Sequence, residues 1–159
     1  MRVEYWIIIG LWIIGITGFI LLILRKDLRK GILSFMMFQA IIWFFNMFLF
    51  KYGFISAPIR ELPKAHDFPL TLDYLFHPLL FSIFYIHKSG KIIPFLAWVS
   101  AATLLDVVLE RYTDILEFGK MNGFGLFLYF LFLYCLSHFC CNWFYKDKTM
   151  FQADRWETQ

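Results

Sequence analysis

Two uninterrupted runs without a charged side chain, residues 5–24 and 31–50, most constrain what this chain can fold into. Each run has 20 residues, the length that an α-helix needs to cross the roughly 30 Å hydrocarbon core of a bilayer. A third run, residues 121–145, lacks Asp, Glu, Lys and Arg throughout. The basic segment RKDLRK follows the first run without a small-residue cleavage site, which predicts a retained span rather than a cleaved signal peptide.

The composition agrees with a membrane location, because 60% of the 159 residues are hydrophobic and only 17% are charged. Soluble domains contain about 25% charged residues. A chain of this size buries only part of its surface on folding, so the excess apolar surface is expected to face lipid. The net charge of +3, without a basic arm, argues against a nucleic-acid partner. We expect the lipid bilayer as partner, with a homo-oligomer or a membrane partner protein as further alternatives.

Two further apolar runs contain polar residues, namely Asp73 and His77 in residues 68–87 and Asp106 in residues 92–110. They form either two spans, joined by the turn HKSGK, or one re-entrant pair. We favour two spans, because lipid leaves no partner for exposed backbone and each run is long enough to cross alone. The prediction is an all-α polytopic transmembrane helical bundle with five spans. It forms a single domain over residues 1–148, with spans at about 5–24, 31–50, 68–87, 92–110 and 121–145, followed by a polar tail at 149–159.

Lys and Arg are distributed unequally over the connecting segments of this five-span arrangement. With the N-terminus outside, nine of the 15 basic residues lie in cytoplasmic segments and six in outer ones. Basic residues are enriched in cytoplasmic loops, so the bias predicts an outer N-terminus and a cytoplasmic C-terminus.

Alternating spans place the loop after the second span and the loop after the fourth on one face of the bundle. Asp73 and His77 are four residues apart, as are Asp106 and Glu110, so each pair shares a helix face. If neighbouring antiparallel helices bring these ends to one depth, the acids meet a proline-punctuated loop above them. The candidate binding residues are Arg60, Glu61, Asp73, His77, Asp106, Glu110, Arg111, Tyr112 and Asn46.

Charges inside a membrane are costly, so such residues normally pair or line a functional site. The simplest interpretation is a salt-bridge network that holds the loop against the helix ends. The functional alternative is an outward cavity for a small polar solute, a cation or a lipid head group. A membrane enzyme that acts on lipid is a third class, although no catalytic residue, metal site or cofactor is predicted.

Two weaker polar patterns favour packing over chemistry. Gln39 and Asn46 lie seven residues apart on one face of the second span, where amides bond neighbouring helices or line the same cavity. Cys135, His138 and Cys141 fan over about 120° of a helix, which is too broad for a clean haem or zinc ligand set. Because the three cysteines all lie within residues 135–141, a disulfide framework is not expected.

Three segments carry a resemblance to a known group of proteins: KYGFISAPIREL, LTLDYLFHPLLFSIFYIHK and LLDVVLERYTDILEF. They resemble an uncharacterised family of small multi-spanning membrane proteins of spore-forming Gram-positive bacteria, over nearly the whole chain. In this chain Asp106 stands where the family has Glu, and His77 precedes Pro78 where the family has Tyr. The resemblance implies a multi-pass protein of the bacterial cytoplasmic membrane and supplies no activity. The positions that match are Tyr52, Gly53, Pro58, Arg60, Glu61, Tyr74, Pro78, Glu110, Tyr112 and Thr113.

Overall fold

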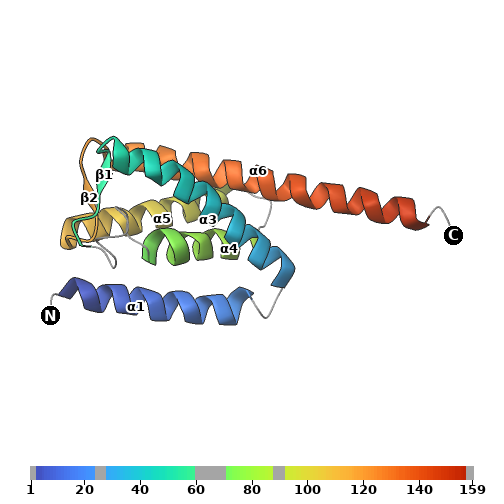
Figure 1. Ribbon diagram of the computed structural model, residues 1–159, viewed down its shortest axis with the longest axis horizontal. Coiled ribbons are helices and arrows are strands. Elements are labelled where there is room, and N and C mark those ends of the chain that lie inside the picture. The colour runs from blue at the N-terminus through green and yellow to red at the C-terminus, as the bar shows by residue number, and fades with distance from the viewer. Residues whose placement is uncertain (1–2, 24–27, 60–70, 88–91, 157–159) are drawn as a thin grey trace.

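The computed structural model describes residues 3–23, 28–59, 71–87 and 92–156, and the side chains of 3–21, 28–59, 71–87 and 92–145. The described chain is mostly helical (Figure 1). Its helices are α1 (Val3–Gly18), α3 (Leu28–Lys51), α4 (His77–His87), α5 (Ile92–Tyr112) and α6 (Gly123–Trp156), with short π-helical segments η1 (Phe19–Ile23) and η2 (Thr71–Phe76).

Within the described residues, four helical segments are long and apolar enough to cross a membrane: Val3–Leu21, Leu28–Lys51, Ile92–Tyr112 and Gly123–Tyr145. They coincide with the first, second, fourth and fifth predicted spans to within a few residues. The chain therefore has the helical, apolar build of a multi-pass membrane protein. The helix α6 continues to Trp156, so most of the predicted polar tail is helical.

Local hydrogen bonds explain where α6 begins and where α3 ends. Asn122 precedes α6, and its Oδ1 accepts a hydrogen bond from the N–H of Gly125 at 2.8 Å, which is an N-cap. At the end of α3, the N–H of Phe54 donates to the carbonyl of Leu49 and that of Gly53 to Phe50. Gly53 has a φ of +69°, so these bonds form the left-handed helix stop that favours glycine.

The third predicted span differs from the others. Its described part is η2 followed by α4, which has 11 residues and is only about 16 Å long. The change from π to α occurs beside Pro78, which has no N–H to continue the earlier hydrogen-bond register. Because α4 is too short to cross a bilayer alone, the five-span prediction is not established by length at this position.

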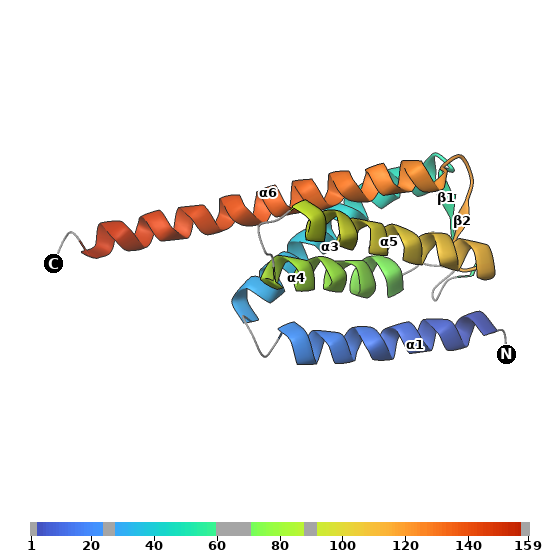
Figure 2. The same cartoon turned by 180° about the vertical axis from the view of Figure 1, so that it is seen from behind.

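The short helix α4 lies inside the bundle, between α1 on one side and α3, α5 and α6 on the other (Figures 1 and 2). Seven of its 11 residues are buried, including Phe81 and Tyr85. Phe81 stacks on Phe38 of α3 at 4.8 Å between ring centroids and meets the edge of Tyr134 of α6 at 5.3 Å. This aromatic contact between three helices forms the centre of the larger core cluster.

The loops after α3 and α5 lie side by side, as the alternating arrangement predicts. Strand β1 (Ile55–Ser56) pairs antiparallel with β2 (Glu117–Phe118), in the register Ile55 to Phe118. The N–H of Ile59 also donates to the carbonyl of Asp114 at 3.1 Å. The strand pairing itself was not predicted, and it adds a small two-stranded ribbon to an otherwise helical fold.

Candidate functional site

A small cavity of about 20 Å³ lies beneath this ribbon, where Ile55 and Leu116 form part of its wall. Five different elements each contribute one polar side chain to it. These side chains are Asn46 from α3, Asp73 from η2, His77 from α4, Asp106 from α5 and Tyr129 from α6. The other described lining residues are aliphatic or aromatic. The cavity is therefore the point at which the whole bundle brings its polar groups together.

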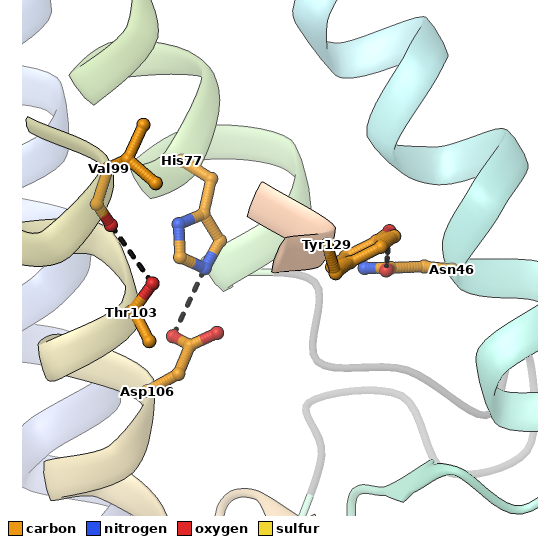
Figure 3. A network of polar contacts seen from close by, with 6 residues as sticks. All are labelled: Asn46, His77, Val99, Thr103, Asp106 and Tyr129. Carbon is orange, nitrogen blue, oxygen red and sulfur yellow. Dashed lines mark hydrogen bonds and ion pairs between the residues drawn. The ribbon is translucent and has the colours of Figure 1, made fainter. Parts of the chain in front are cut away.

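The central contact joins His77 and Asp106. Nε2 of the imidazole lies 3.2 Å from Oδ1 of the carboxylate (Figure 3), a charged pair when the imidazole is protonated. The two residues are only 1% and 5% exposed, and the imidazole packs 4.8 Å from the ring of Phe130. Nδ1 of His77 has no hydrogen-bond partner among the described residues. The pair thus links α4 to α5 in an environment without bulk water.

Asp73 lies one turn before His77 and is 3% exposed. Both side chains line the same cavity, as their four-residue spacing predicts. Asp73 and Asp106 come from the start of one helical segment and the end of the next, so the two helix ends do meet at one depth. Two carboxylates and one imidazole therefore share a space in the interior of the bundle.

A second polar contact borders the cavity opposite His77. The hydroxyl of Tyr129 donates to Oδ1 of Asn46, joining α6 to α3 (Figure 3). Asn46 was a predicted site residue, whereas Tyr129 was missed in a run rich in Phe and Tyr. The hydroxyl of Tyr129 was the sequence feature that could have identified it as a site residue, because a buried Tyr hydroxyl usually needs a hydrogen-bond partner. Nearby, Thr103 donates to the carbonyl of Val99 at 3.0 Å within α5.

The remaining predicted site residues do not line the cavity. Glu110 is half-buried one turn beyond Asp106, and Arg111 and Tyr112 are exposed, since they turn away from the buried face of α5. Arg60 and Glu61 lie outside the described residues. The pairing of Arg60 with the acids therefore stays a prediction. Within the described chain, fewer of the predicted residues line the cavity than the sequence predicts.

The structure also shows the surroundings of His138 and of the three cysteines in α6. Nδ2 of Asn142 lies 3.1 Å from Nδ1 of His138, so this histidine is hydrogen-bonded within α6. The three cysteines are free thiols, of which Cys135 is exposed and Cys141 buried. Over the described residues, no group of three or more His, Cys, Asp or Glu side chains is arranged to hold a metal ion.

Comparison with known proteins adds no assignment to this geometry. No protein-family model, curated protein or solved structure matches this chain. The similarity to membrane proteins of spore-forming bacteria therefore stays a prediction from the sequence. What the structure itself assigns is a predominantly helical chain with four helices able to span a membrane and a buried polar cluster between them.

Proposed function

We propose that this chain crosses the bacterial cytoplasmic membrane five times, with the N-terminus outside and the C-terminus in the cytoplasm. The four long helices supply four crossings, and η2 with α4 supplies the fifth within the protein interior. The excess of Lys and Arg in the cytoplasmic segments supports this orientation. The start of α1 and the β1–β2 ribbon lie at the same end of the bundle, which supports five alternating crossings (Figure 1).

Labelling of single cysteines tests this topology. In a variant without the three native cysteines, Ser56→Cys and Lys120→Cys should react with an impermeant maleimide added to intact cells. Thr149→Cys should react only after the membrane is opened. Labelling of residues 56 and 120 from opposite sides would contradict the arrangement, and labelling of residue 149 in intact cells would reverse its orientation.

We further propose that the cavity binds a small cation, with the hydrated proton as its smallest candidate. The volume of about 20 Å³ has room for about one water molecule, so a lipid head group or an organic solute does not fit inside it. The lining offers carboxylate, amide and phenol oxygens and an imidazole. Because no three His, Cys, Asp or Glu side chains of the described chain are arranged to hold a metal ion, the proton is the occupant that this lining suits best. Ionisable residues in the interior of membrane proteins often mark such ion or proton sites.

One observation carries this proposal: five separate elements converge with one polar side chain each on a cavity of one-water size. Two pairs of these side chains are in direct contact, His77 with Asp106 and Tyr129 with Asn46. Asp73, which is 3% exposed, adds a second carboxylate to the same space. The convergence is therefore better suited to holding an occupant.

Thermal unfolding of the detergent-purified chain tests the proposal directly. Titration with Na⁺, K⁺, Mg²⁺ or Ca²⁺ against choline at constant ionic strength, and at several pH values, should reveal the occupant that raises the Tm. A ligand at 100 times its Kd stabilises by about 2.7 kcal/mol. Asp73→Asn and Asp106→Asn should stay folded and lose this dependence. The exposed carboxylate at the same end supplies the matched control, Asp114→Asn, which should keep the dependence.

The structural alternative rests on a specific observation, the direct contact of His77 with Asp106 at 3.2 Å. If this pair only ties α4 to α5, removal of one partner leaves the other buried and costs about 3–5 kcal/mol. Asp106→Asn would then unfold at a much lower Tm, no metal cation would raise the Tm, and the pH dependence that comes from the His77–Asp106 pair would persist in Asp73→Asn. Strong destabilisation without ligand dependence would thus favour the network and overturn the binding site.

A further inference from the structure

A second polar cluster lies farther along α6, at the other end of α4, and the cation site does not use it. The hydroxyl of Tyr85 donates to Oδ1 of Asn142 at 3.1 Å, and Nδ2 of Asn142 contacts Nδ1 of His138 at 3.1 Å. The rings of Tyr85 and His138 lie 5.8 Å apart. Eight residues separate His77 from Tyr85 on α4, so this cluster is displaced by about 12 Å along the bundle.

Two buried hydroxyl groups lie between the clusters on the inner face of α6. Phe130 packs on His77 at the first cluster, and His138 belongs to the second. Tyr134 and Ser137 stand between them in the sequence, about 6 and 10 Å beyond Phe130 along the helix axis. Both are 0% exposed, and neither hydroxyl has a hydrogen-bond partner among the described residues.

These two hydroxyls differ from the other buried ones in the bundle. Ser34, Ser82 and Thr103 each donate to a backbone carbonyl of their own helix. Nearly all buried polar groups in proteins bond to the protein or to ordered water, because an unsatisfied one is costly. The hydroxyls of Tyr134 and Ser137 therefore keep the capacity to donate and to accept a hydrogen bond that the other buried hydroxyls have already used.

We propose that Tyr134 and Ser137 belong to a water-assisted proton path that connects the Asp73–His77–Asp106 site to the Tyr85–Asn142–His138 cluster. This inference rests on the proposed cation site and identifies the proton as the occupant of that site. A hydroxyl accepts one hydrogen bond and donates another, so a proton passes along hydroxyls and waters as each O–H bond breaks while the next forms. No electron moves, every carrier is restored, and the net result is one proton displaced along the membrane potential or a pH gradient.

The same geometry argues against a metal ion as the transported species. A metal cation needs several oxygen ligands at each stop, whereas a proton needs one acceptor at a time. Tyr134 and Ser137 supply one hydroxyl each between the two clusters. His138 and Asn142 are half-buried, so the second cluster provides the contact with the opposite end of the bundle.

A flux assay in liposomes tests the path. The full chain is reconstituted with a pH-sensitive dye inside, and a potassium gradient with valinomycin imposes a potential that draws cations inward. The wild-type chain should acidify the lumen faster than protein-free vesicles do. Ser137→Ala and Tyr134→Phe should slow the initial rate about tenfold, the change expected when one hydrogen bond is lost from the path.

Ser82→Ala is the matched control, because Ser82 is equally buried but its hydroxyl already donates to the carbonyl of Pro78. It should transport protons at the wild-type rate. Monodispersity and Tm are measured for each variant first. If Ser137→Ala does not fold, Tyr134→Phe carries the test, since it removes only one oxygen atom.

The outcomes separate the path from the cation site. Wild-type vesicles no faster than empty ones, equal rates for Ser137→Ala and Ser82→Ala, or Na⁺ influx without acidification would each overturn the path. If stabilisation that depends on ligand or pH and is lost in Asp73→Asn persists in those cases, the cation site stands and only the path fails. If that dependence is also absent, both proposals fall.

Discussion

Helix α1 and the central segment of η2 with α4 reverse the usual relation between apolarity and burial. Residues 5–24, which α1 and η1 largely cover, contain no charged side chain, yet only Ile8, Leu11 and Gly15 of α1 are buried. The central segment contains Asp73 and His77, yet four of the six residues of η2 and seven of the 11 in α4 are buried. In a soluble protein the apolar helix would lie at the centre.

The difference follows from the solvent that each segment faces. Lipid is as apolar as Leu, so an apolar helix gains little by leaving it and can remain at the edge of the bundle. A carboxylate or an imidazole is costly in lipid, so the segment that carries it moves into the protein, where partners are available. Between these two segments, the presence of polar side chains and close packing, rather than apolarity alone, decide which one is buried.

The largest effect that tests this comparison is expected from truncation of a buried aliphatic side chain. Leu79→Ala in α4, where Leu79 is 4% exposed, should lower the free energy of unfolding by about 2–5 kcal/mol, because it leaves a cavity. Ile13→Ala in α1 removes a side chain that is 61% exposed and should change stability by about 0.5 kcal/mol or less. Unfolding in mixed micelles measures both, and equal losses would remove the contrast between the two segments.

Introducing a charge on the outer face of α1 tests whether that face lies in lipid. Ile13→Lys should cost about 3 kcal/mol near the middle of a membrane helix, and the same change on a water-exposed surface would cost almost nothing. Membrane insertion and unfolding in mixed micelles provide the measurement. Glu4→Lys, in the first turn of the same helix, is the control, because a lysine there reaches the interface. An Ile13→Lys protein as stable as the wild type would argue against a lipid-facing α1.

Close approach between the two segments depends on Gly15. A Cβ atom there would lie 2.5 Å from Cδ2 and 2.7 Å from Cγ of Leu75 in η2, so Gly15→Ala should cost about 1–3 kcal/mol through overpacking. Gly10→Ala is the control, since no atom lies within 4 Å of its Cβ position. In a double-mutant cycle, Leu75→Ala should relieve part of the cost. Additive losses would show that α1 does not pack on η2 at this point.

The smallest effect is expected at the hydrogen bond between Tyr129 and Asn46. Tyr129→Phe removes the hydroxyl that donates to Oδ1 of Asn46 and should lower the free energy of unfolding by about 1 kcal/mol. Tyr5→Phe on the exposed part of α1 should leave stability unchanged. Thermal unfolding of the purified variants compares them, and indistinguishable midpoints would mean that the contact contributes nothing to holding α3 against α6.

Much of the fold and part of the site follow from local patterns. The three long uncharged runs predict three of the four membrane-competent helices, and the apolar run 92–110, which contains Asp106, predicts the fourth. The four-residue spacing of Asp73 and His77 agrees with the cavity that both side chains line. Asp73 and Asp106 line one cavity, in agreement with the expectation that neighbouring antiparallel helices bring these positions to one depth. Glu110 was expected beside them, but it lies one helical turn, about 6 Å, beyond Asp106 along the same face of α5 and does not line the cavity. Tyr129 was missed because nothing local distinguishes it from its aromatic neighbours.

The amino-acid sequence by itself determined which segments are apolar helices and which residues are too polar to face lipid, because both properties reside in short stretches of chain. Only the tertiary structure decided that η2 and α4 lie at the centre, that Asn46 meets Tyr129, and that five elements enclose one cavity. Those outcomes depend on how helices far apart in the sequence rotate and pack, and side-chain volume and shape govern that packing over the whole bundle.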